Sequence, residues 1–172
     1  LVNGVNDKWT RATVFSSLGE QSIELLDELA QGSKVRRTNL VPALKPLGGI
    51  IARSRGKAEI LSVIERHLAA DFGWEPEERI ALLKGIAADV RRRPFIGAQK
   101  SVFGLVADHP AARANVEKTF QAARNRATGR QSSAPRASVI ELLAYSTYKE
   151  DGETLLKLLA PAQPQPVQLA AA

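Results

Sequence analysis

Few residues in this sequence have the chemistry of catalysis. Its 2 histidines are His67 and His109, and its Cys count is 0. Neither histidine has a partner at a metal-ligating spacing such as H-E-x-x-H, so we expect His67 to be a partly exposed helical residue and His109 to lie in a turn. The lack of Cys excludes disulfides, thiolate metal sites and C-x-x-C-H haem attachment within these residues. We therefore predict no catalytic, cofactor-binding or metal site, and no enzymatic activity, for this segment.

Three short motifs carry no reaction chemistry either. The pair Glu77-Glu78 follows a proline and is typical of the first turn of a helix, where acids favour the positive end of the helix dipole. We expect Glu150-Asp151 to lie in a cap or a solvated turn, with Asp151-Gly152 turning the chain into the next helix. The pair Gly48-Gly49 lacks the Gly-Lys-Ser/Thr ending of a phosphate-binding loop.

Basic residues are the strongest candidates for binding. The formal net charge is +6, and residues 30–57 contain no acid. The candidate interaction surface comprises these side chains: Lys34, Arg36, Arg37, Lys45, Arg53, Arg55, Lys57, Arg91, Arg92 and Arg93. On one side of a curved helical stack they would form a positive trough for an acidic protein, an anionic polysaccharide or nucleic acid. Arginines at a helix C-terminus can instead simply complement the dipole, and an aromatic content of 5% argues against a base-stacking surface.

The spacing of apolar residues predicts helices along most of the chain. Ile60, Ile64 and Leu68, for example, share one helix face. Helices are expected over residues 22–31, 40–51, 57–70, 76–93, 99–107, 111–127, 136–146 and 153–160. No long alternation of apolar and polar residues suggests a sheet, and no apolar run reaches the roughly 20 residues of a membrane span. The sequence therefore predicts an all-α protein without a transmembrane segment.

The two ends of the chain are similar to each other. The segment DKWTRATVF at 7–15 can be aligned with PQPVQLAAA at 164–172, and each resembles the first helix of a HEAT-type repeat. At about 40 to 47 residues per unit, we predict a HEAT-like α-solenoid of about four units; an irregular helical bundle is the alternative. Residues 1–33 would form one repeat-like pair and 34–130 a degenerate centre. Residues 135–172 would form a second pair and the start of a further repeat, so we expect a fragment of a longer chain.

Three runs together carry a resemblance to a known family: residues 7–19, residues 46–60, and residues 142–171. They resemble the helical region of exported proteins known as PVC-type haem-binding, or membrane-bound dehydrogenase-like, proteins. That family places a sugar-dehydrogenase-like propeller first, a HEAT-like array next and a cytochrome c domain last. The resemblance implies a periplasmic or extracellular location and a redox parent, with haem c only in a downstream domain. It transfers no catalytic or haem-binding residue to this chain.

Two functions follow as hypotheses. The first is a non-catalytic scaffold or interaction segment, whose partners are flanking domains of the same polypeptide or another protein. The second is an autonomous basic helical domain that binds nucleic acid or another polyanion.

Overall fold

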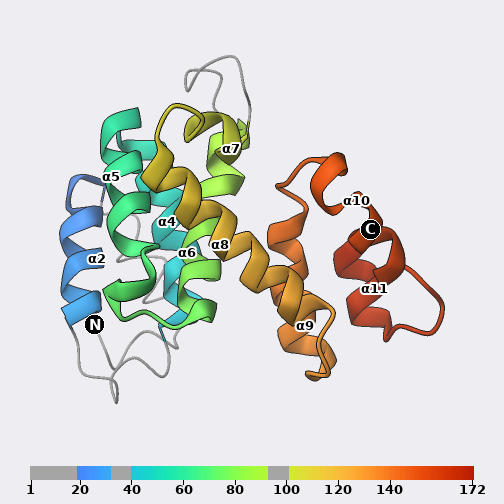
Figure 1. Ribbon diagram of the computed structural model, residues 1–172. Helices are drawn as coiled ribbons and strands as arrows, with labels where there is room; N and C mark the ends of the chain where they lie inside the picture. Colours follow the sequence, from blue (N-terminus) through green and yellow to red (C-terminus); the bar gives the residue numbers. More distant parts are fainter. Residues whose placement is uncertain (1–18, 32–39, 93–100) are drawn as a thin grey trace.

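The computed structural model describes residues 19–31, 40–92 and 101–172, and these ranges are helical, with no strand among them (Figure 1). The elements in chain order are η1 (Gly19–Gln21), α2 (Ser22–Gln31), α4 (Val41–Ser54), α5 (Lys57–His67), η2 (Ala70–Phe72), α6 (Pro76–Arg92), α7 (Val102–Leu105), α8 (Pro110–Ala127), α9 (Ser133–Leu143), α10 (Tyr148–Leu158) and α11 (Gln165–Ala171). The all-α prediction is confirmed for these ranges. The segment at 7–15 that was compared with the C-terminal end lies outside them.

Prolines and acids set several of the helix starts. Pro76 and Pro110 are the first residues of α6 and α8, where a missing backbone N–H costs nothing. At the start of α6 the carboxylate of Glu78 accepts a hydrogen bond of 2.8 Å from the N–H of Glu75. The carboxylate of Glu59 accepts a bond of 3.0 Å from the N–H of Gly56 before α5.

Several helix boundaries in the C-terminal half differ from the prediction. Helix α9 spans Ser133–Leu143, three residues earlier than the expected 136–146, and α7 ends at Leu105 instead of residue 107. The helix expected from residue 153 begins at Tyr148, so Asp151 and Gly152 lie inside α10 and do not form a turn. The backbone of Gly152 is buried beneath the Tyr148 ring, and a Cβ added at Gly152 would come within 2.5 Å of Tyr148 Cδ2. The absence of a side chain therefore lets the ring cover the first turn of the helix.

The centre of the fold is an unusually close contact between α4 and α6. Gly48 and Gly49 of α4 lie against the backbone of α6, and Gly85 of α6 lies against the backbone of α4. A Cβ at Gly48 would collide with the carbonyl oxygen of Leu82, and a Cβ at Gly85 with that of Lys45. Glycine is thus required at this crossing because no side chain fits between the backbones.

The two helices run in the same direction. Lys45 and Gly49 lie beside Gly85, and further along α4 the Nε of Arg53 lies 3.8 Å from Oδ1 of Asp89. Residue numbers therefore increase in the same direction along both helices, and the C-terminal ends of the two helices lie at the same end of the molecule. The intervening helix α5 brings the chain back from the end of α4 towards the start of α6.

Apolar side chains from α2 to α8 surround this pair and form most of the core. The largest fully buried ones are Phe120, Leu26, Leu44, Leu47, Ile51, Ile60, Ile64, Leu68, Leu82, Leu83, Ile86 and Leu105. Helix α8 crosses from this body towards α9, and α9 packs in turn on α11 (Figure 1). Arg136 near the start of α9 donates a hydrogen bond of 2.8 Å to the side-chain oxygen of Gln163, just before α11, so these two helices start side by side.

Candidate functional site

Two of the described members of the candidate basic surface, Lys45 and Arg55, are engaged in contacts within the protein. Nζ of Lys45 lies 3.0 Å from Oε2 of Glu141 on α9. Arg55 is mostly buried, pairs with Glu59 at 3.3 Å and donates to the carbonyl oxygen of Glu20. Lys34, Arg36, Arg37 and Arg93 lie outside the described residues. Side chains that pair with acids inside the fold have less charge to offer a polyanion.

The structure brings together one subset of these residues. Arg53 near the end of α4 and Arg91 and Arg92 at the end of α6 are exposed at the shared C-terminal end of the two helices. Positive side chains at that end complement the partial negative charge of the last carbonyl groups. Lys57, also exposed, begins the next helix.

His67 is not the partly exposed residue that the sequence suggested; its side chain is 1% exposed. Its ring packs against Phe72 and Trp74, with ring centroids 4.5 Å and 5.4 Å away. Its Nε2 lies 3.0 Å from Oδ1 of Asp27 on α2. The expectation failed because the η2 segment folds back over the end of α5 and covers the imidazole. His109 directly precedes α8 as its N-cap, in keeping with the expected turn.

Burial of the imidazole lowers the pKa of His67 from 6.5 to about 4. The negative charge of Asp27 opposes this shift, and the positive charge of Arg66 adds to it. His67 is therefore neutral in the folded protein near pH 7, where it provides packing and one contact with a carboxylate.

The lowered pKa of His67 predicts that the folded protein loses stability in mild acid. Above pH 6.5 His67 is neutral in both states. Between pH 6.5 and about 4 the unfolded chain binds a proton that the folded chain does not. The free energy of unfolding should thus fall by up to about 3 kcal/mol across this window. Urea unfolding at several pH values measures it.

His67→Gln removes the imidazole and should flatten the stability profile between pH 6.5 and 4, whatever its effect on stability at pH 7. The comparison is between the slopes of the wild-type and variant profiles. Equal slopes for the wild type and His67→Gln would contradict the assignment.

The acidic pairs contribute structure. Glu77 pairs with Arg126 of α8 at 2.8 Å, and Glu78 caps the start of α6 as expected. Asp151 was expected in a cap or a solvated turn. It lies in the first turn of α10, where it is fully buried and accepts two hydrogen bonds from Arg124, Nε to Oδ1 at 2.5 Å and Nη2 to Oδ2 at 3.0 Å. The hydrogen bonds to Asp151 raise the pKa of the Arg124 guanidinium above its ordinary value. This ion pair joins α8 to α10.

The described residues contain neither a metal-binding cluster nor a membrane-spanning helix. No group of three or more His, Asp or Glu side chains in ranges 19–31, 40–92 and 101–172 is arranged to hold a metal ion. Within the same ranges no helix is both long enough and apolar enough to cross a membrane.

A wide cleft of about 670 Å³ lies beside the Arg124–Asp151 pair. Helices α7, α8 and α10 line it through Phe103, Glu117, Lys118, Gln121, Arg124 and Glu150. Acids and bases balance along this lining, and it contains no histidine. The cleft is an open surface depression lined mostly by charged side chains.

A smaller cavity of about 180 Å³ lies between α4, α6, α8 and α9. Its lining comprises Val41, Glu77, Ile80, Ala81, Lys84, Arg126, Gln131, Pro135, Ser138 and Val139. Most of these side chains are apolar or small. Lys84 differs from the other charged residues of the lining because its side chain is only 7% exposed.

The Lys84 ammonium is held by α9. Its Nζ donates to the carbonyl oxygen of Ser138 at 2.9 Å and lies 3.0 Å from Oε2 of Glu141 and 3.4 Å from Oγ of Ser138. Burial lowers the pKa of Lys84, opposed by its hydrogen bond to Glu141. Burial acts to raise the pKa of Glu141, but hydrogen bonds from Lys45 and Lys84 outweigh it and leave that pKa below its usual value.

The candidate basic surface did not include Lys84. One signal was available in the sequence: Lys84 interrupts the otherwise apolar run from Ile80 to Ala87 on α6. A lone lysine in such a run indicates either a partnered buried amine or a site. Its partners come from α9, far along the chain, and no local pattern specifies them.

Comparison with known proteins identifies no relative of this chain. No protein-family model, no curated protein and no solved structure matches the chain.

Proposed function

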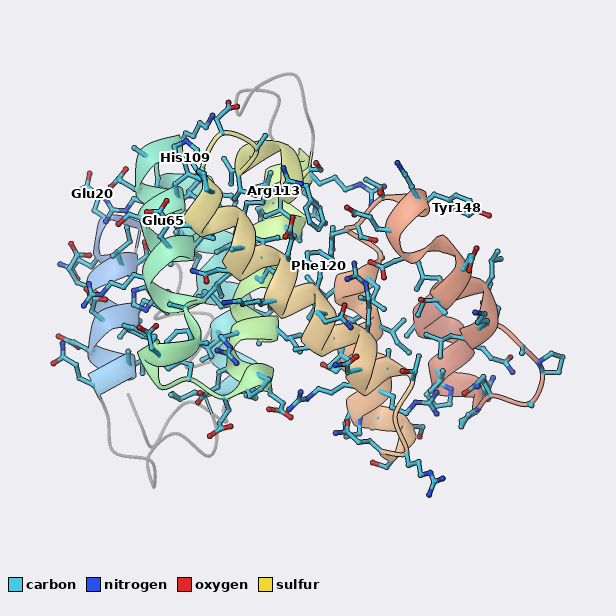
Figure 2. All side chains as sticks on the ribbon, in the orientation of Figure 1. Glu20, Glu65, His109, Arg113, Phe120 and Tyr148 are labelled. Atoms are coloured by element: carbon cyan, nitrogen blue, oxygen red, sulfur yellow. The ribbon has the colours of Figure 1, made fainter. Side chains whose placement is uncertain are left out.

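We propose that this chain is a non-catalytic helical-repeat scaffold, whose C-terminal helices bind a neighbouring helical element. The observation that carries the proposal is the set of exposed apolar side chains on α10 and α11. Tyr148 is 78% exposed, Leu156 55% and Leu169 70%, and Leu159 is also exposed. Tyr148 projects away from the helical body at the start of α10 (Figure 2).

The α10 members share one side of their helix. At 3.6 residues per turn, Tyr148 and Leu156 of α10 and Leu159, its C-cap, fall within an arc of about 80°. Leu158 of the same helix is buried in the core. The helix thus has one apolar side within the fold and a second that faces solvent, as helices in the interior of a stacked array do before the next unit is added.

The helix packing supports a HEAT-like arrangement as part of this proposal. Helices two apart in the chain pack closely in α4 with α6 and in α9 with α11. Helices α4 and α6 run in the same direction, and helices α9 and α11 start side by side. Equivalent helices of successive repeats stack in this way.

The sequence resemblance suggests the kind of longer protein to which this segment belongs. It suggests an exported redox protein in which this segment separates a propeller from a cytochrome c domain, in the periplasm or outside the cell. Partners would then be the flanking domains. The full reading frame tests this part: it should encode the propeller before these residues and a C-x-x-C-H motif after them.

Self-association tests the apolar face. We expect the purified chain to associate through α10 and α11, and Leu156→Lys with Leu169→Lys to weaken that association at least about 10-fold, because burying one leucine contributes about 2 kcal/mol. Sedimentation velocity over a concentration series measures it. Ala58→Lys with Ala114→Lys adds the same charge at exposed sites on α5 and α8 and should have no effect.

Two results would overturn this function. One is a monomer at every concentration for both the wild type and the leucine variant. The other is tight, salt-sensitive heparin binding that charge reversal at Arg53, Arg91 and Arg92 abolishes, which would favour the polyanion-binding alternative.

A further inference from the structure

The cavity beside Lys84 has the composition of a small-molecule site. Ile80, Ala81, Pro135 and Val139 give it apolar walls, and Lys84 brings a buried amine to them. Small-ligand sites typically combine such walls with a few converging polar groups. This feature is separate from the exposed face of α10 and α11.

The charges around the cavity leave one positive charge uncompensated. Glu77 and Arg126 form a pair at 2.8 Å and cancel. Lys45 and Lys84 both contact the same Oε2 of Glu141, each at 3.0 Å. Two ammonium groups therefore share one carboxylate, and a single negative charge on a ligand would balance the cluster.

Polar groups are available to hold that charge. The interaction of Lys84 Nζ with Oγ of Ser138 is the longest of its contacts at 3.4 Å, so it is the one most readily exchanged for a ligand oxygen. Once that contact is released, the Ser138 hydroxyl can rotate and donate a hydrogen bond to the same ligand. Both residues line the cavity.

The volume of this partly open pocket favours a small ligand. An apolar protein cavity of about 150 Å³ accommodates benzene. The volume of about 180 Å³ here leaves room for one further small group. A dianion such as phosphate would exceed the single surplus charge and would leave the apolar walls uncovered.

We infer that this cavity binds a small monocarboxylate with a compact apolar body, about the size of benzoate, with its carboxylate held by Lys84 and Ser138. The apolar body lies against Ala81 and Val139, which approach from α6 and α9. The site requires no reaction and is independent of whether the outer face of α10 and α11 binds a partner.

Benzoate, benzyl alcohol and inorganic phosphate are the probes, titrated into the full chain and followed by backbone amide shifts in NMR. Benzoate should shift the amides of Ala81 and Val139 with a Kd of about 1 mM, a strength typical of so few ligand atoms. Benzyl alcohol has a similar size without the charge and should bind at least about 10-fold more weakly. Phosphate should not shift these amides.

Variants separate the two parts of the site. Lys84→Met keeps the length of the side chain and removes its charge, and it should weaken benzoate at least about 10-fold. Ser138→Ala, at an exposed position that tolerates truncation, should weaken it several-fold. Ala81→Leu should block the cavity to benzoate and benzyl alcohol alike. Lys118→Met removes a lysine from the other cleft and should change nothing.

Three outcomes would overturn the inference. They are equal binding of benzoate and benzyl alcohol, benzoate binding that survives both Lys84→Met and Ser138→Ala, and no benzoate-induced shift at the amides that line the cavity. A fourth contradicting outcome is phosphate binding in place of benzoate, which would reassign the cluster as a general anion site.

Discussion

Gly85→Ala should destabilise the protein by about 3 kcal/mol, because one methyl group would force α4 and α6 apart. The new Cβ would collide with the carbonyl oxygen of Lys45, and it would lie 2.8 Å from the backbone nitrogen of Gly49. Both atoms belong to a helix backbone and cannot rotate away. Alanine favours a helix over glycine by only about 1 kcal/mol, so the steric cost decides the sign. Urea unfolding measures the change.

The control for this variant is Gly19→Ala. A Cβ at Gly19 meets nothing within 4 Å, so its stability should equal or slightly exceed that of the wild type. If Gly85→Ala were as stable as Gly19→Ala, the backbones could not be in contact at this crossing.

Arg124→Ala should cost about 3 to 5 kcal/mol, because it leaves the carboxylate of Asp151 buried without its partner. Asp151 is fully buried, and both of its oxygens accept hydrogen bonds from Arg124. Arg124→Lys should recover little of the loss, since an ammonium cannot reproduce the two parallel bonds. Denaturant unfolding with matched m-values gives the comparison.

Two further variants isolate the pair. Arg113→Ala on the same helix removes an exposed contact with Glu117 and should leave stability unchanged. Arg124→Met combined with Asp151→Leu should be much more stable than Arg124→Ala, because an apolar pair leaves no buried charge. A double variant as unstable as Arg124→Ala would show that packing, and not the unpaired charge, carries the cost.

The helices could be predicted because their signals are local. Pro76 begins α6 as expected, α8 begins at Pro110, one residue before its predicted start, and the spacing of Ile60 and Ile64 identified the buried side of α5. A residue needs only its neighbours within one or two turns to specify such features. The boundary at Tyr148 failed because a ring packed on Gly152 replaced the turn that Asp-Gly usually favours.

The polar sites could not be predicted because their partners are distant in the sequence. His67 is buried by contacts with Asp27, from a helix earlier in the chain, and with Trp74. Lys84 meets Ser138, and Asp151 meets Arg124, only after separate helices have packed. Gly48-Gly49 lies within α4 against α6, and nothing near it in the sequence indicated Gly85 as its counterpart.

The contact between α4 and α6 also restricts how the protein can move. Sliding one helix along the other by a single turn would carry Gly48 and Gly49 away from Gly85 and bring larger residues such as Leu44 or Ala52 to the crossing. The backbones would then have to separate before any shear could occur. The glycines therefore fix the register of this pair, and a ligand or partner can reposition it only as one rigid unit.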